Sequence, residues 1–141
     1  MLKRPVLMLA LTLCPLPGLA QGVEGIDWHL LAIDGAVVDA AFVATLHIGA
    51  DGWITGQAPC NSYDAENLHP LPGFQPGPIR ATKMACDQLA AEVTFFNALS
   101  AMTALTGGDG GPLVLTGADG RSMEFVPDRA APDTVCTTCA P

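Results

Sequence analysis

The sequence has 141 residues, of which 14 are acidic and 6 are basic, so its formal net charge is −8 at pH 7. A chain of this length can build one domain with a modest hydrophobic core and is too short for two ordinary domains. Its acidity argues against nucleic acids and anionic membrane surfaces as partners, because their phosphates would be repelled rather than neutralised.

The first 20 residues have the pattern of a secretory signal peptide. Lys3 and Arg4 precede an apolar run over residues 6–13, and small residues lead up to Ala20. The run is far shorter than the roughly 20 residues that span a bilayer. We therefore expect cleavage near Ala20, export to the periplasm or the extracellular space, and no transmembrane segment. Cys14 leaves lipidation open as an alternative, although the residue before it is not small.

Four cysteines would remain after cleavage: Cys60, Cys86, Cys136 and Cys139. Disulfides are expected in an oxidising compartment, and three pairings are possible. We favour Cys60–Cys86 with Cys136–Cys139, because the first pair flanks the most patterned part of the chain and the second lies in a tail of small and polar residues. A bridge that closes a loop of about 25 residues contributes roughly 3 kcal/mol in a chain-entropy model.

The first half of the remaining chain predicts strands. One strand is expected over residues 26–33, with Trp28 and Leu30 on the same face, and a second over residues 41–48. The apolar face of the second strand would carry Phe42, Ala44, Leu46 and Ile48. Residues 50–52 contain Asp-Gly, which tolerates the positive φ of a tight turn, so a hairpin with a short partner strand is expected there.

A loop and one helix should follow. Residues 68–78 are rich in proline and glycine and predict a loop, because proline lacks a backbone donor and restricts the residue before it. Asp87 can cap a helix that runs to about Met102. Apolar residues recur at helical spacing and would form one broad face that covers a sheet. These residues are Leu89, Val93, Phe95, Phe96, Leu99 and Met102.

The last part of the domain predicts a second hairpin. Residues 107–111 are a glycine-rich turn, and strands are expected over residues 113–116 and 122–126. A single helix cannot supply the crossovers of a parallel sheet, so the fold should be α+β with a mainly antiparallel sheet. We expect one domain over residues 21–126 and a flexible tail over residues 127–141.

Several short motifs have an order and spacing that is typical of one protein family. They are Trp28 and Leu30, the hairpin from Gly52 to Gly56, Cys60-Asn61, Thr82-Lys83-Met84-Ala85-Cys86, Glu92 with Phe95-Phe96 and Leu99, and Leu113-Val114-Leu115. Together they resemble the META domain, the HslJ-like family of bacterial envelope proteins, over about residues 26–126. Two positions depart from the family pattern. Pro59 replaces a glycine, and Lys83 replaces an arginine whose bidentate contacts a lysine cannot reproduce.

The resemblance implies a partly open, barrel-like antiparallel sheet with one packed helix. It implies a link to stress, antibiotic tolerance or secretion rather than to a defined reaction. The fold has also been likened to secretin pilot proteins, whose cracked barrel holds a lipid chain. That analogy is at the level of fold and does not assign a function.

The motif residues have structural roles as their simplest interpretation. Asn61 and Thr82 should tie loop backbone near the Cys60–Cys86 bridge, since short polar side chains satisfy local donors and acceptors in turns. Tyr63 is expected to be a core or hairpin residue. Lys83 and Met84 complete the set of family-motif residues.

Other candidate sites are weaker. Cys136 and Cys139 have the spacing of a dithiol oxidoreductase, but the helix that activates such a thiol is not expected there. His29, His47 and His69 lie on separate expected strands and a loop, so we assign them surface roles and expect no metal site. No nucleophile elbow, phosphate-binding loop or cofactor motif is present.

These observations predict a non-enzymatic, exported META-type domain that acts as an accessory or interaction module of the bacterial cell envelope, with a role in stress. Its partner would be an envelope protein. The main alternative is a carrier that holds a lipid or another small apolar ligand between the sheet and the helix. A lesser alternative is thiol-disulfide exchange through Cys136 and Cys139.

Overall fold

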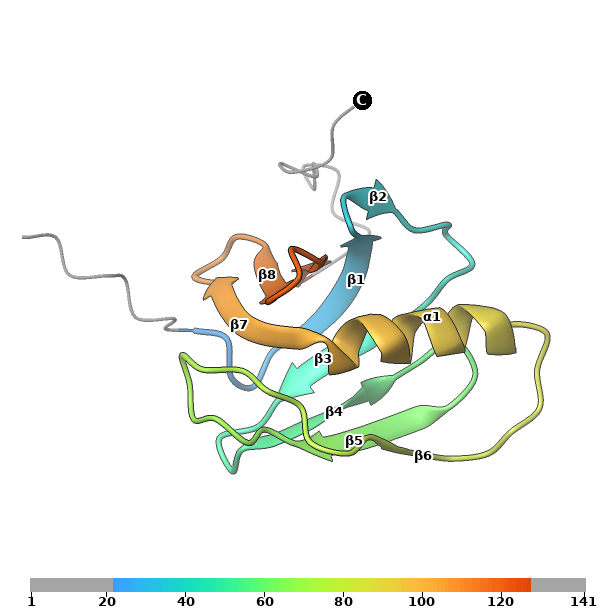
Figure 1. Ribbon diagram of the computed structural model, residues 1–141, viewed down its shortest axis with the longest axis horizontal. Helices are drawn as coiled ribbons and strands as arrows, with labels where there is room; N and C mark the ends of the chain where they lie inside the picture. The colour runs from blue at the N-terminus through green and yellow to red at the C-terminus, as the bar shows by residue number, and fades with distance from the viewer. Residues whose placement is uncertain (1–21, 128–141) are drawn as a thin grey trace, which may run out of the picture.

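The computed structural model describes residues 22–127, which form nine strands and one helix (Figure 1). The expected signal peptide and the tail with Cys136 and Cys139 lie outside the described residues. The elements in chain order are β1 (Asp27–Ile33), β2 (Ala36–Val37), β3 (Thr45–Ile48), β4 (Trp53–Gln57), β5 (Ser62–Glu66), β6 (Arg80–Ala81), α1 (Leu89–Ser100), β7 (Met102–Gly107), β8 (Leu113–Gly117) and β9 (Ser122–Val126).

All strands belong to one sheet, and every pairing in it is antiparallel. The strand order is β6-β5-β4-β3-β1-β9-β8-β7, and β2 pairs with β1 beside this path. The two end strands, β6 and β7, do not pair with each other, so the sheet is open rather than a closed barrel. This confirms the α+β class with a mainly antiparallel sheet and one helix.

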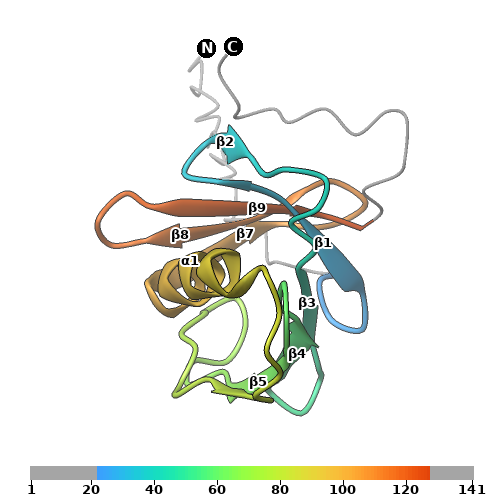
Figure 2. The same ribbon diagram turned by 90° about the vertical axis from the view of Figure 1, so that its right-hand side faces the viewer.

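The sheet curves around α1, which lies between the β7–β9 part and the β4–β5 part (Figure 2). Large side chains from the inner face of the curved sheet, among them Trp28, Leu46, Ile54 and Phe125, meet Phe95 of the helix in one core. Each of them is fully buried. Burial of one such side chain contributes about 2 kcal/mol, so this curved core is the main source of stability.

The loop between β5 and β6 joins the two ends of the open sheet. It folds back on itself through a bridge between Asn67 and Pro76, and a second bridge joins Gly73 to Ala104 of the end strand β7. Phe74 lies between these bridges and is fully buried in the core. The loop expected over residues 68–78 therefore covers the opening of the sheet with an aromatic side chain.

Both expected hairpins are present. Residues Ile48 and Ile54 face each other across β3 and β4, and Leu115 faces Met123 across β8 and β9. The strand expected over residues 41–48 begins only at Thr45, however. The preceding residues form a turn in which the Asp39 carboxylate accepts the backbone N–H of Ala41, a local bond that competes with strand pairing.

The predicted helix is too long at both ends. It begins at Leu89 after Gln88, and no side-chain cap is present, so the cap expected at Asp87 is wrong. Its last residue is Ser100, and Met102 already pairs with Gly117 in the β7–β8 ladder. The helix therefore ends before Met102. In the strand, the Met102 side chain is fully buried.

The broad apolar helix face is also wrong in part. Leu89 and Val93 are 46% and 57% exposed, whereas the buried helix residues are Glu92, Phe95, Ala98 and Leu99. The buried stripe is narrow and carries a carboxylate at its first position. Glu92 therefore belongs to the inside of the domain.

Candidate functional site

The Glu92 carboxylate is buried where the start of α1 meets the turn between β4 and β5. Its Oε2 accepts the backbone N–H groups of Cys60 and Asn61 at 3.0 and 2.8 Å, and its Oε1 accepts the Asn61 side-chain amide at 2.8 Å. Carboxylates accept such bonds about twice as strongly as neutral groups do. Glu92 thus holds the turn against the first turn of the helix.

The Asn61 side chain extends the same network to the segment before the helix. Its Oδ1 accepts the Thr82 hydroxyl at 2.8 Å and the Met84 backbone N–H at 2.7 Å. Its Nδ2 lies 3.4 Å from the Met84 carbonyl oxygen. We call Cys60, Asn61, Thr82, Met84 and Glu92 the Asn61–Glu92 cluster.

A disulfide between Cys60 and Cys86 adds a covalent link to this cluster, with the two Cα atoms 5.9 Å apart. It is the pair that the sequence favoured. Cys86 is exposed and Cys60 is half-buried. Through Cys86, the bridge fixes the C-terminal end of the exposed segment that contains Lys83 and Met84. Met84 is 62% exposed. The motif residues of this region therefore build a rigid support, with polar atoms bonded to one another.

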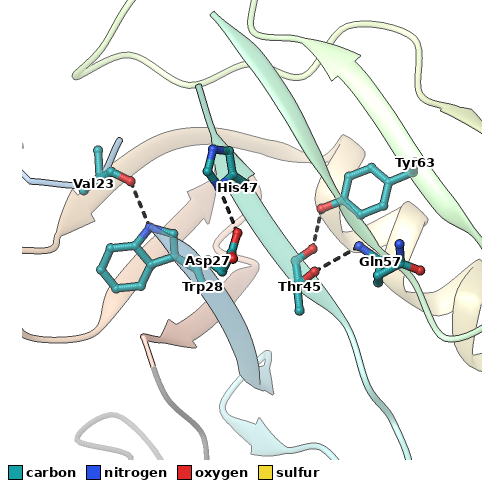
Figure 3. A network of polar contacts seen from close by, with 7 residues as sticks. All are labelled: Val23, Asp27, Trp28, Thr45, His47, Gln57 and Tyr63. Atoms are coloured by element: carbon teal, nitrogen blue, oxygen red, sulfur yellow. Dashed lines mark hydrogen bonds and ion pairs between the residues drawn. The ribbon is translucent and has the colours of Figure 1, made fainter. Parts of the chain in front are cut away.

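The Tyr63 hydroxyl lies where β3 and β4 stop pairing, next to Thr45. Its hydroxyl donates to the Thr45 carbonyl at 2.8 Å, while the Gln57 backbone N–H bonds to the Thr45 hydroxyl at 2.9 Å (Figure 3). A Cβ atom on Gly56 would lie 2.2 Å from the Thr45 carbonyl oxygen, so only glycine fits. Burial raises the pKa of the Tyr63 phenol. The tyrosine hydroxyl thus replaces a ladder bond where the two strands part.

The Tyr63 ring also joins the sheet to the helix. It makes edge contacts with Phe95 and Phe96 at centroid distances of 5.5 and 5.6 Å. Such contacts contribute about 1 kcal/mol beyond area burial. Tyr63 is a core residue, in line with the expected role.

The opposite face of the same strands is polar. Cross-strand partners form a row from β1 to β6 that consists of Asp27, His47, Thr55, Asp64 and Arg80. Side chains two residues apart on a strand share a face, which adds His29, Thr45, Trp53, Gln57, Ser62 and Glu66. We call this surface the outer polar face.

Several side chains of the outer polar face are held in pairs. His47 Nδ1 and Asp27 Oδ1 lie 2.8 Å apart (Figure 3), and Gln57 Nε2 donates to Ser62 Oγ at 2.8 Å. The guanidinium of Arg80 donates from Nε to Asp64 Oδ2 at 2.8 Å and also from Nη2.

The same guanidinium stacks near the Trp53 ring, with its Cζ atom 5.0 Å from the ring centroid. Cation–π contact and ion pairing therefore act on one planar group. Two open depressions lie on this face, with volumes of about 600 Å³ and 460 Å³. Ser62 and Tyr63 line both of them, so the depressions are neighbours.

The three histidines lie on two strands and a loop of the described residues. His29 and His47 lie on the neighbouring strands β1 and β3, and His69 lies in the loop after β5. Among residues 22–127, no group of three or more His, Cys, Asp or Glu side chains could hold a metal ion. Across the same part of the chain, no helix has the length and apolar character needed to cross a membrane.

Sequence reasoning missed two arrangements. Glu92 was noted only as part of a motif, and the outer polar face was not foreseen. The alternation in Ser62, Asp64 and Glu66 could have indicated β5, since polar residues at every second position are typical of a half-exposed strand.

The model of the META domain family matches residues 21–130 of this sequence. The chain belongs to the META domain family. The expected resemblance is thereby confirmed over most of the chain. No curated protein sequence is significantly similar to it.

Solved structures share the META-like fold at low sequence identity. A protein from Burkholderia xenovorans, solved by NMR, has a TM-score of 0.60 and 19% identity, and the match covers 88% of this chain and 99% of that one. A DUF4847 family protein from Bacteroides vulgatus, solved by crystallography, has a TM-score of 0.56 and 14% identity, with 80% and 96% of the chains covered. These likenesses concern the fold alone.

Proposed function

We infer that this META domain is a non-enzymatic accessory module of the cell envelope, exported and able to bind an envelope protein. The main support is the Asn61–Glu92 cluster. Its carboxylate and amide are bonded to each other and to backbone, so the most distinctive polar residues of the domain serve to hold a segment in place. A carboxylate that already accepts three N–H bonds is poorly suited to act as a general base.

The segment held by the cluster presents apolar side chains to solvent. Met84 lies in the loop before α1, and Leu89 and Val93 lie one helical turn apart on the same side of α1. Apolar and methionine side chains of this kind are favoured at protein interfaces. We therefore assign the partner contact to residues 83–93, which we call the anchored segment.

Photo-crosslinking in the host envelope tests this function. A photoreactive residue at Met84 or Leu89 should give one discrete crosslinked protein, and the same residue at exposed Asp119, in the turn between β8 and β9, should give none. Replacement of both Cys60 and Cys86 by serine should weaken the crosslink, because the anchored segment loses its covalent support. Turnover of a substrate from a hydrolase or dithiol panel that is abolished by one substitution in the cluster would overturn the proposal.

The carrier alternative gains no support from the packing between sheet and helix. Phe95, Leu99 and Phe125, which would line such a ligand site, are fully buried in the core cluster. An acyl chain could enter only by displacing them. The thiol-exchange alternative depends on Cys136 and Cys139, which lie outside the described residues.

A further inference from the structure

The outer polar face combines an accessible aromatic ring with paired donors and acceptors. Trp53 is 36% exposed, whereas Trp28 on the inner side of the sheet is fully buried. The Arg80 guanidinium lies over one face of the Trp53 ring and is oriented by Asp64. Ligand sites combine aromatic side chains with a small number of placed polar groups that fix the orientation of the ligand.

The paired side chains can bind hydroxyl groups in both directions. A sugar hydroxyl donates one hydrogen bond and accepts others. Within the described residues, the Arg80–Asp64 pair engages Oδ2 of the carboxylate and two guanidinium nitrogens, which leaves Oδ1 and Nη1 for a ligand. The Gln57–Ser62 pair offers an amide oxygen and a hydroxyl in the same way. Adjacent hydroxyls of a sugar ring match such side-by-side donors and acceptors.

The negative charge of the outer polar face argues against anionic ligands. Asp27, Asp64 and Glu66 outnumber Arg80 on this face, so phosphates and acidic sugars would be repelled. A protein partner is disfavoured as well, because protein interfaces need a desolvated core that is poor in charge. Trp53 is the one large apolar side chain exposed here, since the others in the described part of the chain lie outside these strands.

The size of the face suits several sugar units. Neighbouring strands lie about 4.8 Å apart, so the row from Asp27 on β1 to Arg80 on β6 spans about 19 Å. Side chains on strands are held more firmly than side chains on loops, which lowers the entropy cost of binding. We propose that the outer polar face binds a neutral oligosaccharide, stacked on Trp53 and hydrogen-bonded along the row.

NMR titration of the isotope-labelled protein, as processed by its host, tests this site. The probes are chitotetraose and maltotetraose as neutral oligosaccharides and tetragalacturonate as the acidic comparison. At least one neutral probe should shift the backbone amide signals of β3 to β6 at millimolar concentration, and tetragalacturonate should not. Trp53→Ala should weaken binding about tenfold, and Arg80→Lys should weaken it too, because lysine keeps the charge but loses the planar fork.

Arg121→Lys is the matched control for Arg80→Lys, because Arg121 also pairs with a surface aspartate, Asp34, but lies outside the strands of the outer polar face; it should leave the affinity unchanged. Well-dispersed NMR spectra of both site variants establish that they are folded. The proposal is overturned if neither neutral probe shifts these amides, if the acidic probe binds better, or if Trp53→Ala binds as the unmodified protein does. Such a failure would leave the anchored segment and its partner untouched, because residues 83–93 take no part in this site.

Discussion

The substitution Glu92→Gln tests the role of the buried carboxylate with almost no change in shape. The glutamine amide has one acceptor oxygen and one NH₂ group. If the oxygen serves the backbone N–H groups of Cys60 and Asn61, the NH₂ group faces the Asn61 Nδ2 donor, which lies 2.8 Å from Glu92 Oε1. Rotation of the Asn61 amide gives no relief, because its Oδ1 is needed by Thr82 and Met84.

The expected loss follows from these three bonds. A hydrogen bond to a charged group contributes about 1.5–3 kcal/mol and a neutral bond about 0.5–1.5 kcal/mol. The bond from the Asn61 side chain is lost, and the two bonds from the backbone N–H groups of Cys60 and Asn61 become neutral. With some relaxation of the surrounding side chains, the free energy of unfolding should fall by about 3 kcal/mol. For a domain of this size, that loss lowers the melting temperature by roughly 12 °C.

Urea unfolding followed by tryptophan fluorescence measures this loss, because Trp28 is fully buried in the folded domain. Glu66→Gln makes the same chemical change at an exposed position of β5 and should alter the free energy of unfolding by less than about 0.5 kcal/mol. A loss below about 1 kcal/mol for Glu92→Gln would refute the reasoning, since the buried network would then contribute no more than a surface contact does.

Three further changes have defined outcomes. Replacement of both bridge cysteines by serine should lower the free energy of unfolding, measured in urea, by about 3 kcal/mol, because the bridge closes a loop with a sequence separation of 26. Gly56→Ala should cost about 1–3 kcal/mol, since its Cβ would collide with the Thr45 carbonyl, whereas Gly111→Ala meets no atom closer than 3.4 Å and should cost little. Asp34→Asn should cost less than about 1 kcal/mol at pH 7, because the exposed Arg121 bond that lowers the pKa of Asp34 is screened by solvent. This last difference should be constant above the unfolded pKa of about 4 and should vanish as the pH falls through the lower folded pKa, as unfolding measured across that range would show; an unchanged difference at low pH would contradict it.

Local patterns predicted the two hairpins well. The turns at Asp51-Gly52 and Asp119-Gly120 both place glycine at φ +83°, a conformation that few other residues adopt without strain. Alternating apolar residues then fix which strand face is buried. Turn chemistry and period-two alternation act over a few residues, so sequence reasoning can detect them.

The missed features depend on contacts between distant residues. Glu92 in a first helical turn also suits an exposed position near the helix dipole, and nothing nearby in sequence shows that its bonding partners are Cys60 and Asn61. The pairs Asp27–His47 and Asp64–Arg80 arise from strand register, which was not known before the strands were placed. Likewise, the expected helix included Met102, the first residue of β7, because helical spacing continued that far, and only the pairing of Met102 with β8 ends the helix earlier.

The position of β1 in the middle of the sheet determines when the domain can fold. Its neighbours are β3 and β9, and His29 pairs with Val126 at the other end of the described chain. Such long-range pairing makes folding slow compared with folding of a helical bundle, because distant segments must meet before they are stabilised. A chain still under synthesis therefore lacks one neighbour of its central strand until the residues of β9 have been added. Such a delay suits the export that we propose, because a chain must stay unfolded to be translocated.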